Sequence, residues 1–245
     1  MTRLYTCNLH VHTCLSPCGD LDMHPSAVVE EAVLQHLDII AVCDHNTSGN
    51  VRYVQKAAEG SGLTVIPGME VTTREEVHVI ALFESVEQLE SLQEIVYEHL
   101  SGLNDEKAFG MQVLVNEIGE VEGFNERLLI GATDISLETL VEKVHESGGL
   151  AVAAHIDRPS FSVLSQLGFV PGHVPFDALE ISARLPFDQA RSRFPELAGY
   201  TFITSSDAHF VHDIGKTCIR MNLEEPSFPE IRLAFEKKKG RYVLE

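Results

Sequence analysis

Nearly every short apolar run of this chain ends in, or contains, a histidine or a carboxylate. The first run, over residues 4–9, leads directly into the tripeptide His10-Val11-His12. The same pattern recurs downstream at Asp44 and His45, Glu70, His78, His155, and Asp207 and His209. In a parallel α/β barrel the C-terminal ends of the strands converge on one face, where active sites lie. Imidazoles and carboxylates gathered on that face predict a site for several metal ions.

Strands and helices alternate along most of the chain. Amphipathic patterns predict helices over 25–35, 51–59, 136–147 and 229–239. Further apolar runs predict strands near 177–182, 200–205 and 217–223. Alternation at this spacing favours a mostly parallel sheet, and 245 residues is a usual length for one α/β barrel. We therefore expect a single α/β barrel domain over residues 1–245.

The segment 84–135 interrupts this alternation. A helical stretch over 86–100 is followed by apolar runs at 111–115 and 128–130, with Gly119 between them. A strand, a turn and a second strand punctuated by glycine predict a small hairpin. We expect this helix–hairpin insert to lie over the barrel mouth, either as a lid or as a long connection that packs on the barrel.

The charge of the chain restricts its partners. Asp and Glu outnumber Lys and Arg by 37 to 18, which gives a formal net charge of -19. Binding of long nucleic acid requires a basic surface, so we expect long nucleic acid to be an unfavourable partner. A small phosphorylated substrate is compatible with this charge, because bound divalent cations would offset part of it within the site.

Other features point to a cytoplasmic protein. No apolar stretch approaches the length of a membrane span, and residues 1–5 do not begin a signal peptide. The five cysteines are odd in number and lie mostly in or beside apolar runs, which suits reduced thiols. We expect no membrane partner, and the oligomeric state stays open.

The order of the motifs resembles a known family. HVH at residue 10, DHN at 44, GMEV at 68, VHV at 77, AHIDR at 154 and SDAH at 206 closely match the PHP (polymerase and histidinol phosphatase) family of metal-dependent phosphoesterases. The resemblance runs from residue 6 to about residue 215. It implies a distorted (β/α)7 barrel that holds two or three divalent ions (zinc, manganese or iron) at the strand ends.

The resemblance also assigns the ligands of two ions. The first ion would be held by two imidazoles and two carboxylates, from His10, His12, Glu70 and Asp207. Glu70 would bridge to a second ion, shared with His78 and His155. Asp44 would contribute to catalysis by orienting its neighbours, since ligating histidines usually need a hydrogen-bond acceptor behind them.

A third ion would be held by His45 and His209 together with a residue from the loop after His12. Family members often carry Ser-Asp-Gly or a histidine there, whereas this loop reads TCLSPCGDLD from residue 13. The candidate ligands are therefore Asp20, Cys18 and Asp22. We prefer Asp20, with Cys18 as its rival, because a thiolate would favour zinc and a carboxylate a harder ion such as manganese or magnesium.

Two arginines are candidates for binding the substrate. Arg158 lies three residues after His155, and an arginine beside a metal ligand suits bidentate recognition of a phosphate. Its expected role includes catalysis. Arg184 follows the strand over 177–182 and is the weaker candidate, because it could equally pair with a surface carboxylate.

Taken with the resemblance, these features predict an enzyme that hydrolyses a small phosphomonoester or a nucleotide by metal-activated water. Two other readings compete with it. One is an exonuclease or phosphodiesterase that releases nucleotides from short oligonucleotides. The other is a non-catalytic regulatory barrel that keeps its metal for stability, and the complete ligand set weighs against it. A metal amidohydrolase is less favoured, because no lysine follows a strand where a carbamylated bridge would be expected.

Overall fold

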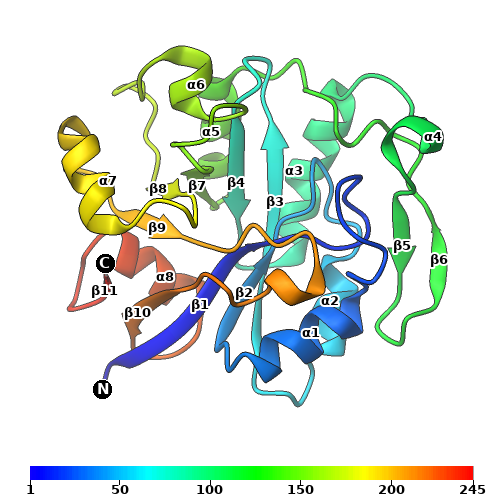
Figure 1. Cartoon of the computed structure of the whole chain (residues 1–245), viewed down its shortest axis with the longest axis horizontal. Coiled ribbons are helices and arrows are strands. Elements are labelled where there is room, and N and C mark those ends of the chain that lie inside the picture. The colour runs from blue at the N-terminus through cyan, green and yellow to red at the C-terminus, as the bar shows by residue number, and fades with distance from the viewer. Residues whose placement is uncertain (245) are drawn as a thin grey trace.

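The computed structural model describes residues 1–244, whose main sheet is bent into a nearly closed barrel (Figure 1). Nine strands pair in the order β11-β10-β1-β2-β3-β4-β7-β8-β9. Their bounds are β1 Arg3–Val11, β2 Ile39–Val42, β3 Thr64–Thr72, β4 His78–Leu82, β7 Leu150–Ala153, β8 Ala178–Ile181, β9 Phe202–Thr204, β10 Ile219–Leu223 and β11 Tyr242–Leu244. The predicted α/β barrel is confirmed, and its seven inner strands are β1 to β4 and β7 to β9.

The directions of the strands place six C-terminal ends at one end of the barrel. β1, β2 and β3 are parallel to one another, and so are β7, β8 and β9. β4 is antiparallel to both β3 and β7, so the two parallel groups run in the same direction. The barrel closes just beyond β1 and β9, where Val11 pairs with Ala208 and the His12 N–H donates to the Ala208 carbonyl at 3.0 Å.

The expectation of a mostly parallel sheet is wrong. β4 runs against both of its neighbours, and β10 pairs antiparallel with β1, with Cys7 opposite Ile219. A parallel return to the sheet needs a crossover of a dozen or more residues, usually built as a helix. The chain instead turns from β3 into β4 over the few residues 73–77. Before β10 it forms only the short 3-10 helix η2, Val211–Asp213.

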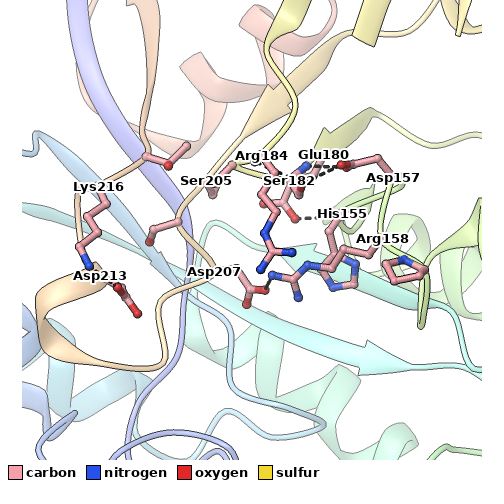
Figure 2. Close-up of a pocket in the computed structure, with 14 residues that line it drawn as sticks. His155, Asp157, Arg158, Glu180, Ser182, Arg184, Ser205, Asp207, Asp213 and Lys216 are labelled. Carbon is pink, nitrogen blue, oxygen red and sulfur yellow. Dashed lines mark hydrogen bonds and ion pairs between the residues drawn. The ribbon is translucent and has the colours of Figure 1, made fainter. Parts of the chain in front are cut away.

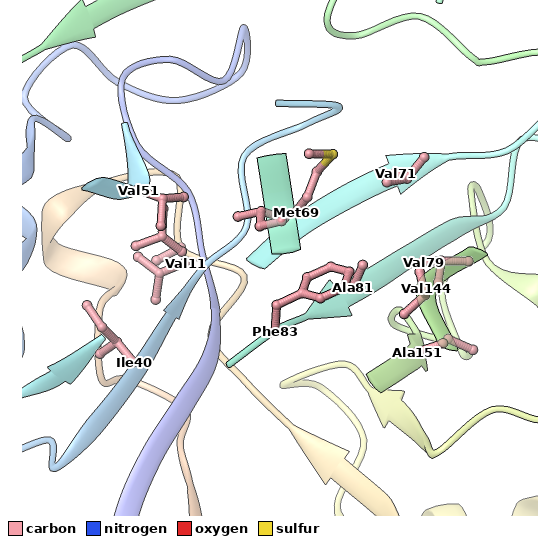
Figure 3. Close-up of a cluster of buried hydrophobic side chains, with 14 of the residues drawn as sticks. Val11, Ile40, Val51, Met69, Val71, Val79, Ala81, Phe83, Val144 and Ala151 are labelled. Carbon is pink, nitrogen blue, oxygen red and sulfur yellow. The ribbon is translucent and has the colours of Figure 1, made fainter. Parts of the chain in front are cut away.

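Helices cover the outside of the barrel. They are α1 Pro25–Leu34, α2 Val51–Ala57, α3 Val86–His99, α4 Glu106–Phe109, α5 Leu137–Glu146, α6 Val163–Leu167, α7 Phe187–Arg193 and α8 Phe228–Phe235, with the 3-10 helix η1 at Pro195–Leu197. Successive residues of a strand face opposite sides of the sheet. Ile40 and Val42 accordingly pack in the cluster beneath the outer helices (Figure 3). Ile39 and Ala41 belong to a second cluster that α8 joins.

The insert over 84–135 forms a helix and a hairpin, but its second strand is not where the apolar pattern predicted it. β5, Val113–Val115, pairs antiparallel with β6, Val121–Phe124. Residues 128–130 instead carry Leu129, which is fully buried beside Leu15 and Leu100 and anchors the insert to the barrel. An apolar run that packs in the core and an apolar run that forms a strand have the same composition, so the composition does not distinguish them.

The hairpin lies against the loops that follow β1 and β2, so it flanks the end of the barrel at which the parallel strands finish (Figure 1). Asn50, fully buried, connects the two parts. Its side-chain N–H donates to the Val113 carbonyl at 3.2 Å, and its Oδ1 accepts the Val115 N–H at 3.1 Å. Among residues 1–244 no helix is long and apolar enough to cross a membrane.

Asn50→Ala should loosen the hairpin. The change leaves the buried Val115 N–H without a partner and the Val113 carbonyl with only the weak donor Cys14 Sγ, and each lost bond to a buried group costs about 1–3 kcal/mol. We expect the free energy of unfolding to fall by about 3 kcal/mol and amide hydrogen exchange over 113–124 to accelerate. The control is Asn222→Ala, which removes one exposed bond to the Gly240 carbonyl. Equal destabilisation by both changes would contradict the role of Asn50.

Candidate metal centre

Side chains from seven strands or the loops after them meet at one end of the barrel. His10 lies in β1, Glu70 in β3 and Glu180 in β8, while His155 follows β7. Because β4 runs in the opposite direction, its first residue, His78, lies at this same end. The loops that follow β1, β2 and β9 supply His12, His45, Asp207 and His209. The predicted convergence is therefore seen for every proposed ligand except Asp20.

Glu70 occupies the middle of this group. Its Oε2 lies 3.4 Å from both His10 Nε2 and His12 Nε2 and 3.1 Å from His45 Nδ1. Its Oε1 lies 2.9 Å from His78 Nδ1 and 3.2 Å from His155 Nε2. The Glu70 side chain is only 1 % exposed, so water contributes little to its solvation. Five imidazoles within 3.4 Å of one buried carboxylate are compatible with a bridging ligand, and the bridging role of Glu70 stays a prediction.

The nitrogen lone pairs of this group fit a bound cation. His10 Nε2 and His12 Nε2 lie 3.1 Å apart, a contact that is favourable only with a proton or a metal ion between them. The buried Nδ1 atom of His155 makes no hydrogen bond. Neither does that of His45, despite its 3.1 Å distance from Glu70 Oε2, although buried polar atoms normally do. Imidazole and carboxylate donors suit zinc, manganese or iron.

The possible ligand atoms form three overlapping groups within the described residues. In each group the atoms lie within 4.8 Å of one another, and the groups are His10/His12/Glu70/Asp207, His45/Glu70/His78 and His12/His45/His209. The first contains the same residues as the predicted first ion. In the third, His12 takes the place that was predicted for a residue of the following loop. His155 lies beside Glu70 but outside these groups.

The electrostatics of the centre favour the protonation states that ligands need. Burial lowers the pKa of His12 to about 4 and, with His12, His78 and His209 nearby, holds the pKa of His45 well below its ordinary value. Burial alone would raise the pKa of Glu70, but His78, His10 and His45 outweigh it and hold that pKa well below its ordinary value. These shifts favour neutral imidazoles at His12 and His45 beside an ionised Glu70, the forms that bind metals.

His10 is the exception among the imidazoles. Burial would lower its pKa, but the carboxylates of Glu180, Asp207 and Glu70 outweigh burial and raise the pKa well above its ordinary value. Without a cation, the protonated form of His10 is therefore favoured among these carboxylates. Binding of a divalent ion would release this proton.

A carboxylate behind a ligand fixes the direction of its ring. Asp44 accepts hydrogen bonds from the Thr13 N–H, the Thr13 hydroxyl and the Ser16 hydroxyl, each at 2.7 Å. Ser16 Oγ in turn lies 2.9 Å from His12 Nδ1. Asp44 is fully buried, and the orienting role proposed for it is consistent with these contacts, which act on His12 through Ser16.

Glu180 was missed as a member of the centre. Its Oε2 lies 3.1 Å from His10 Nδ1 and accepts the His155 backbone N–H at 3.0 Å. It therefore turns His10 Nε2 toward Glu70 and holds the turn that carries His155. The sequence signal was a carboxylate within the apolar run Ala178-Leu179-Glu180-Ile181, which was interpreted only as a core strand.

Two of the proposed ligands have strained backbones. His155 has φ 27° and Asp207 has φ 50°, in the left-handed region that residues with a Cβ seldom adopt. Such conformations cost of order 1–3 kcal/mol each and cluster at functional sites. Hydrogen bonds hold both turns: Glu180 accepts the His155 N–H, and Ala208, next to Asp207, bonds the His12 N–H.

The loop after His12 does not bring a carboxylate into the centre. Asp20 Oδ1 accepts the Asp22 N–H at 2.9 Å, while the Asp20 backbone N–H donates to the His209 carbonyl at 2.8 Å. Asp20 thus positions the backbone of His209 in this structure, and its role as a ligand stays a prediction. Cys18 lies close enough for Glu70 and Asp207 to add to the effect of desolvation, which raises the pKa of its thiol to about 12.

Both predicted arginines lie in a pocket beside the centre, which we call the site pocket. Its volume is about 490 Å³, and its polar lining includes Arg158, Arg184, Lys216, Ser182, Ser205 and Ser206. Arg158 Nη2 lies 2.5 Å from Asp207 Oδ2, and the Arg158 side chain is 43 % exposed. Figure 2 shows both guanidinium groups directed into this pocket on the side of Asp207.

Comparison with known proteins identifies relatives of this chain. The PHP domain family matches residues 8–162. A 5'-3' exoribonuclease of Haemophilus influenzae is 25% identical over 196 residues, which cover 63% of this chain and 69% of that protein. The 5'-3' exoribonuclease Rnm of Escherichia coli is 24% identical, with 84% of each chain covered.

The fold is also similar to that of a solved nuclease. The lesion-specific endonuclease PfuEndoQ of Pyrococcus furiosus matches with a TM-score of 0.79 and 20% sequence identity. The match covers 98% of this chain but only 58% of the endonuclease chain. At this identity the likeness concerns the fold alone.

The purified protein should bind at least two divalent ions per chain. Because ligand atoms converge only in the folded state, bound ions should stabilise it, by about 2.7 kcal/mol at an ion concentration of one hundred times the dissociation constant. We expect removal by a chelator to lower Tm, and re-addition of manganese or zinc to restore it. Elemental analysis with less than one ion per chain after such re-addition would contradict the assignment.

Glu70→Gln should remove more than one ion while leaving the fold intact. Glutamine keeps the shape of the side chain but lacks the charge that two ions would share. Glu76→Gln, in the exposed turn before β4, is the matched control and should keep its full metal content. We would measure metal content by elemental analysis and folding by circular dichroism. Full metal content in Glu70→Gln would show that Glu70 does not bridge.

Proposed function

The chain belongs to the PHP domain family of metal-dependent hydrolases acting on phosphoester bonds, and from this premise we propose that it hydrolyses short single-stranded oligonucleotides. The observation that carries the proposal is a pocket with two arginines, a lysine and three serines in its lining, beside a centre of imidazoles and carboxylates. A volume of about 490 Å³ lies within the range of pockets that enclose small ligands. It suits a nucleotide whose phosphate faces the centre.

Arg158 is proposed to bind the reacting phosphate. Its guanidinium already contacts the Asp207 carboxylate at 2.5 Å and is partly exposed to the pocket. A guanidinium has donors on two edges, so it can keep Asp207 on one edge and present a fork to phosphate oxygens on the other. Arg184 has no carboxylate partner among residues 1–244 and is free to bind a second oxygen.

The other side chains of the centre hold the metal ligands in position beside the two arginines. Divalent ions bound by the three ligand groups would supply positive charge for phosphate oxygens and acidify a water. Glu180 holds the ring of His10, and Asp44 acts on His12 through Ser16, so the ligand nitrogens keep their direction. Arg158 adds charge where it develops during phosphoester cleavage.

Two lines of evidence favour an oligonucleotide over a small phosphomonoester. The relatives that match 63% and 84% of this chain are both named 5'-3' exoribonucleases. The pocket also has cations at more than one position, which suits a substrate with more than one phosphate. The net charge of -19 opposes binding of long nucleic acid and favours short strands.

Arg158→Gln should lower the turnover of a single-stranded oligonucleotide by about 100-fold or more, because a preorganised charge at the reacting group is lost. Metal content should stay unchanged, since Arg158 is not a ligand. The assay compares metal-loaded wild type and variant on oligoribonucleotides and on a panel of phosphomonoesters. Cleavage of phosphomonoesters alone would replace the proposed substrate with the small one.

A further inference from the structure

A second pocket adjoins the site pocket on the far side of the segment 157–159. This flank pocket has a volume of about 540 Å³, and its lining includes Leu164, Ser165, Arg193 and Glu196. Asp157, Arg158 and Pro159 line both pockets. The two cavities therefore meet at Arg158, the side chain that contacts Asp207 in the metal centre.

Cations follow the two pockets in an otherwise acidic chain. Arg184 and Lys216 line the site pocket, Arg193 lines the flank pocket, and Arg158 lines both. Lys216 Nζ is 2.7 Å from Asp213 Oδ1. The guanidinium of Arg193 lies 5.2 Å from the ring centre of Phe194, which steadies the side chain without neutralising it. Four of the 18 lysines and arginines thus line the two pockets that meet at Arg158.

Most carboxylates that line the two pockets are held by neighbouring groups of the protein, which leaves Arg184 and Arg193 without a carboxylate partner among residues 1–244. Both oxygens of Asp157 are held by Ser182, through its N–H and its hydroxyl at 2.6 Å each, so this carboxylate is fixed within the protein. Asp207 belongs to the metal centre and Asp213 pairs with Lys216. Glu180 also lines the site pocket, but it is buried and held by His10 and the His155 N–H. Glu196 lines the flank pocket and limits its affinity for anions.

We propose that the two pockets form one groove that binds a single nucleic-acid strand on both sides of the phosphate at Arg158. The inference rests on the proposed function and adds the arrangement of the substrate. A nucleotide occupies the site pocket, the reacting phosphate lies at Arg158, and the strand continues into the flank pocket, where Arg193 binds its next phosphate. The groove therefore favours strands of several nucleotides over a dinucleotide, which is too short to reach Arg193.

The test compares an oligoribonucleotide of six nucleotides with a dinucleotide, using the metal-loaded full chain. Arg193→Gln should raise the ratio of the hexamer KM to the dinucleotide KM about fivefold, with little change in the hexamer kcat. The dependence of log KM on log salt for the hexamer should weaken by about 0.7, the value for one phosphate contact in a single strand. Arg193→Glu should raise the ratio further.

The matched control is Arg3→Gln, which removes an exposed arginine at the opposite end of β1. It carries the same change in net charge but should leave the ratio and the salt dependence at wild-type values. If Arg193→Gln behaves as Arg3→Gln does, or if wild type binds both lengths equally, the groove is overturned while the proposed function stands. If wild type cleaves neither substrate, the proposed function fails and the groove fails with it.

Discussion

The centre depends on one buried carboxylate surrounded by imidazoles. Glu70 is almost inaccessible to water, and five histidines point ring nitrogens at its two oxygens from four different parts of the sheet. A carboxylate in this position would be costly if its neighbours were apolar. It is tolerated because the barrel brings positive or cation-binding groups to it from every side. The reversed direction of β4 belongs to this arrangement, since only that reversal places His78 beside Glu70.

Much of this could be predicted from the sequence, because a ligand that follows an apolar run is delivered to the end of a strand. His10, Asp207 and His155 illustrate the rule. Glu180 was not predicted although it also lies within an apolar run, because no motif marks it and only its contact with His10 shows its use. The direction of β10 and the position of the second hairpin strand were also not predicted. Both are decided by contacts between residues far apart in sequence, such as the burial of Leu129, rather than by the local pattern.

Charge is distributed unevenly over this molecule. The net charge of -19 describes the whole surface, whereas the two pockets beside the centre collect arginines and a lysine. Exposed charges farther apart than about 10 Å are largely screened at moderate salt. A short anion held in these pockets therefore experiences the local cations, while a long polyanion also meets the acidic remainder. In the proposed groove, this balance would set the length of the strand that binds.

The sequence separation of the contacts in the centre also sets an order for its assembly. Glu70 and His78 are 8 residues apart, on two strands joined by a short turn, whereas Glu70 and His155 are 85 apart and His12 and Asp207 are 195 apart. Loop closure makes the short-range pair the cheapest to form. On the ribosome, the Glu70–His78 corner can fold long before residues 207–209 have been synthesised. Binding of metal at the proposed centre would then wait until Val11 and Ala208 pair, so that bound ions would stabilise a barrel that has already closed.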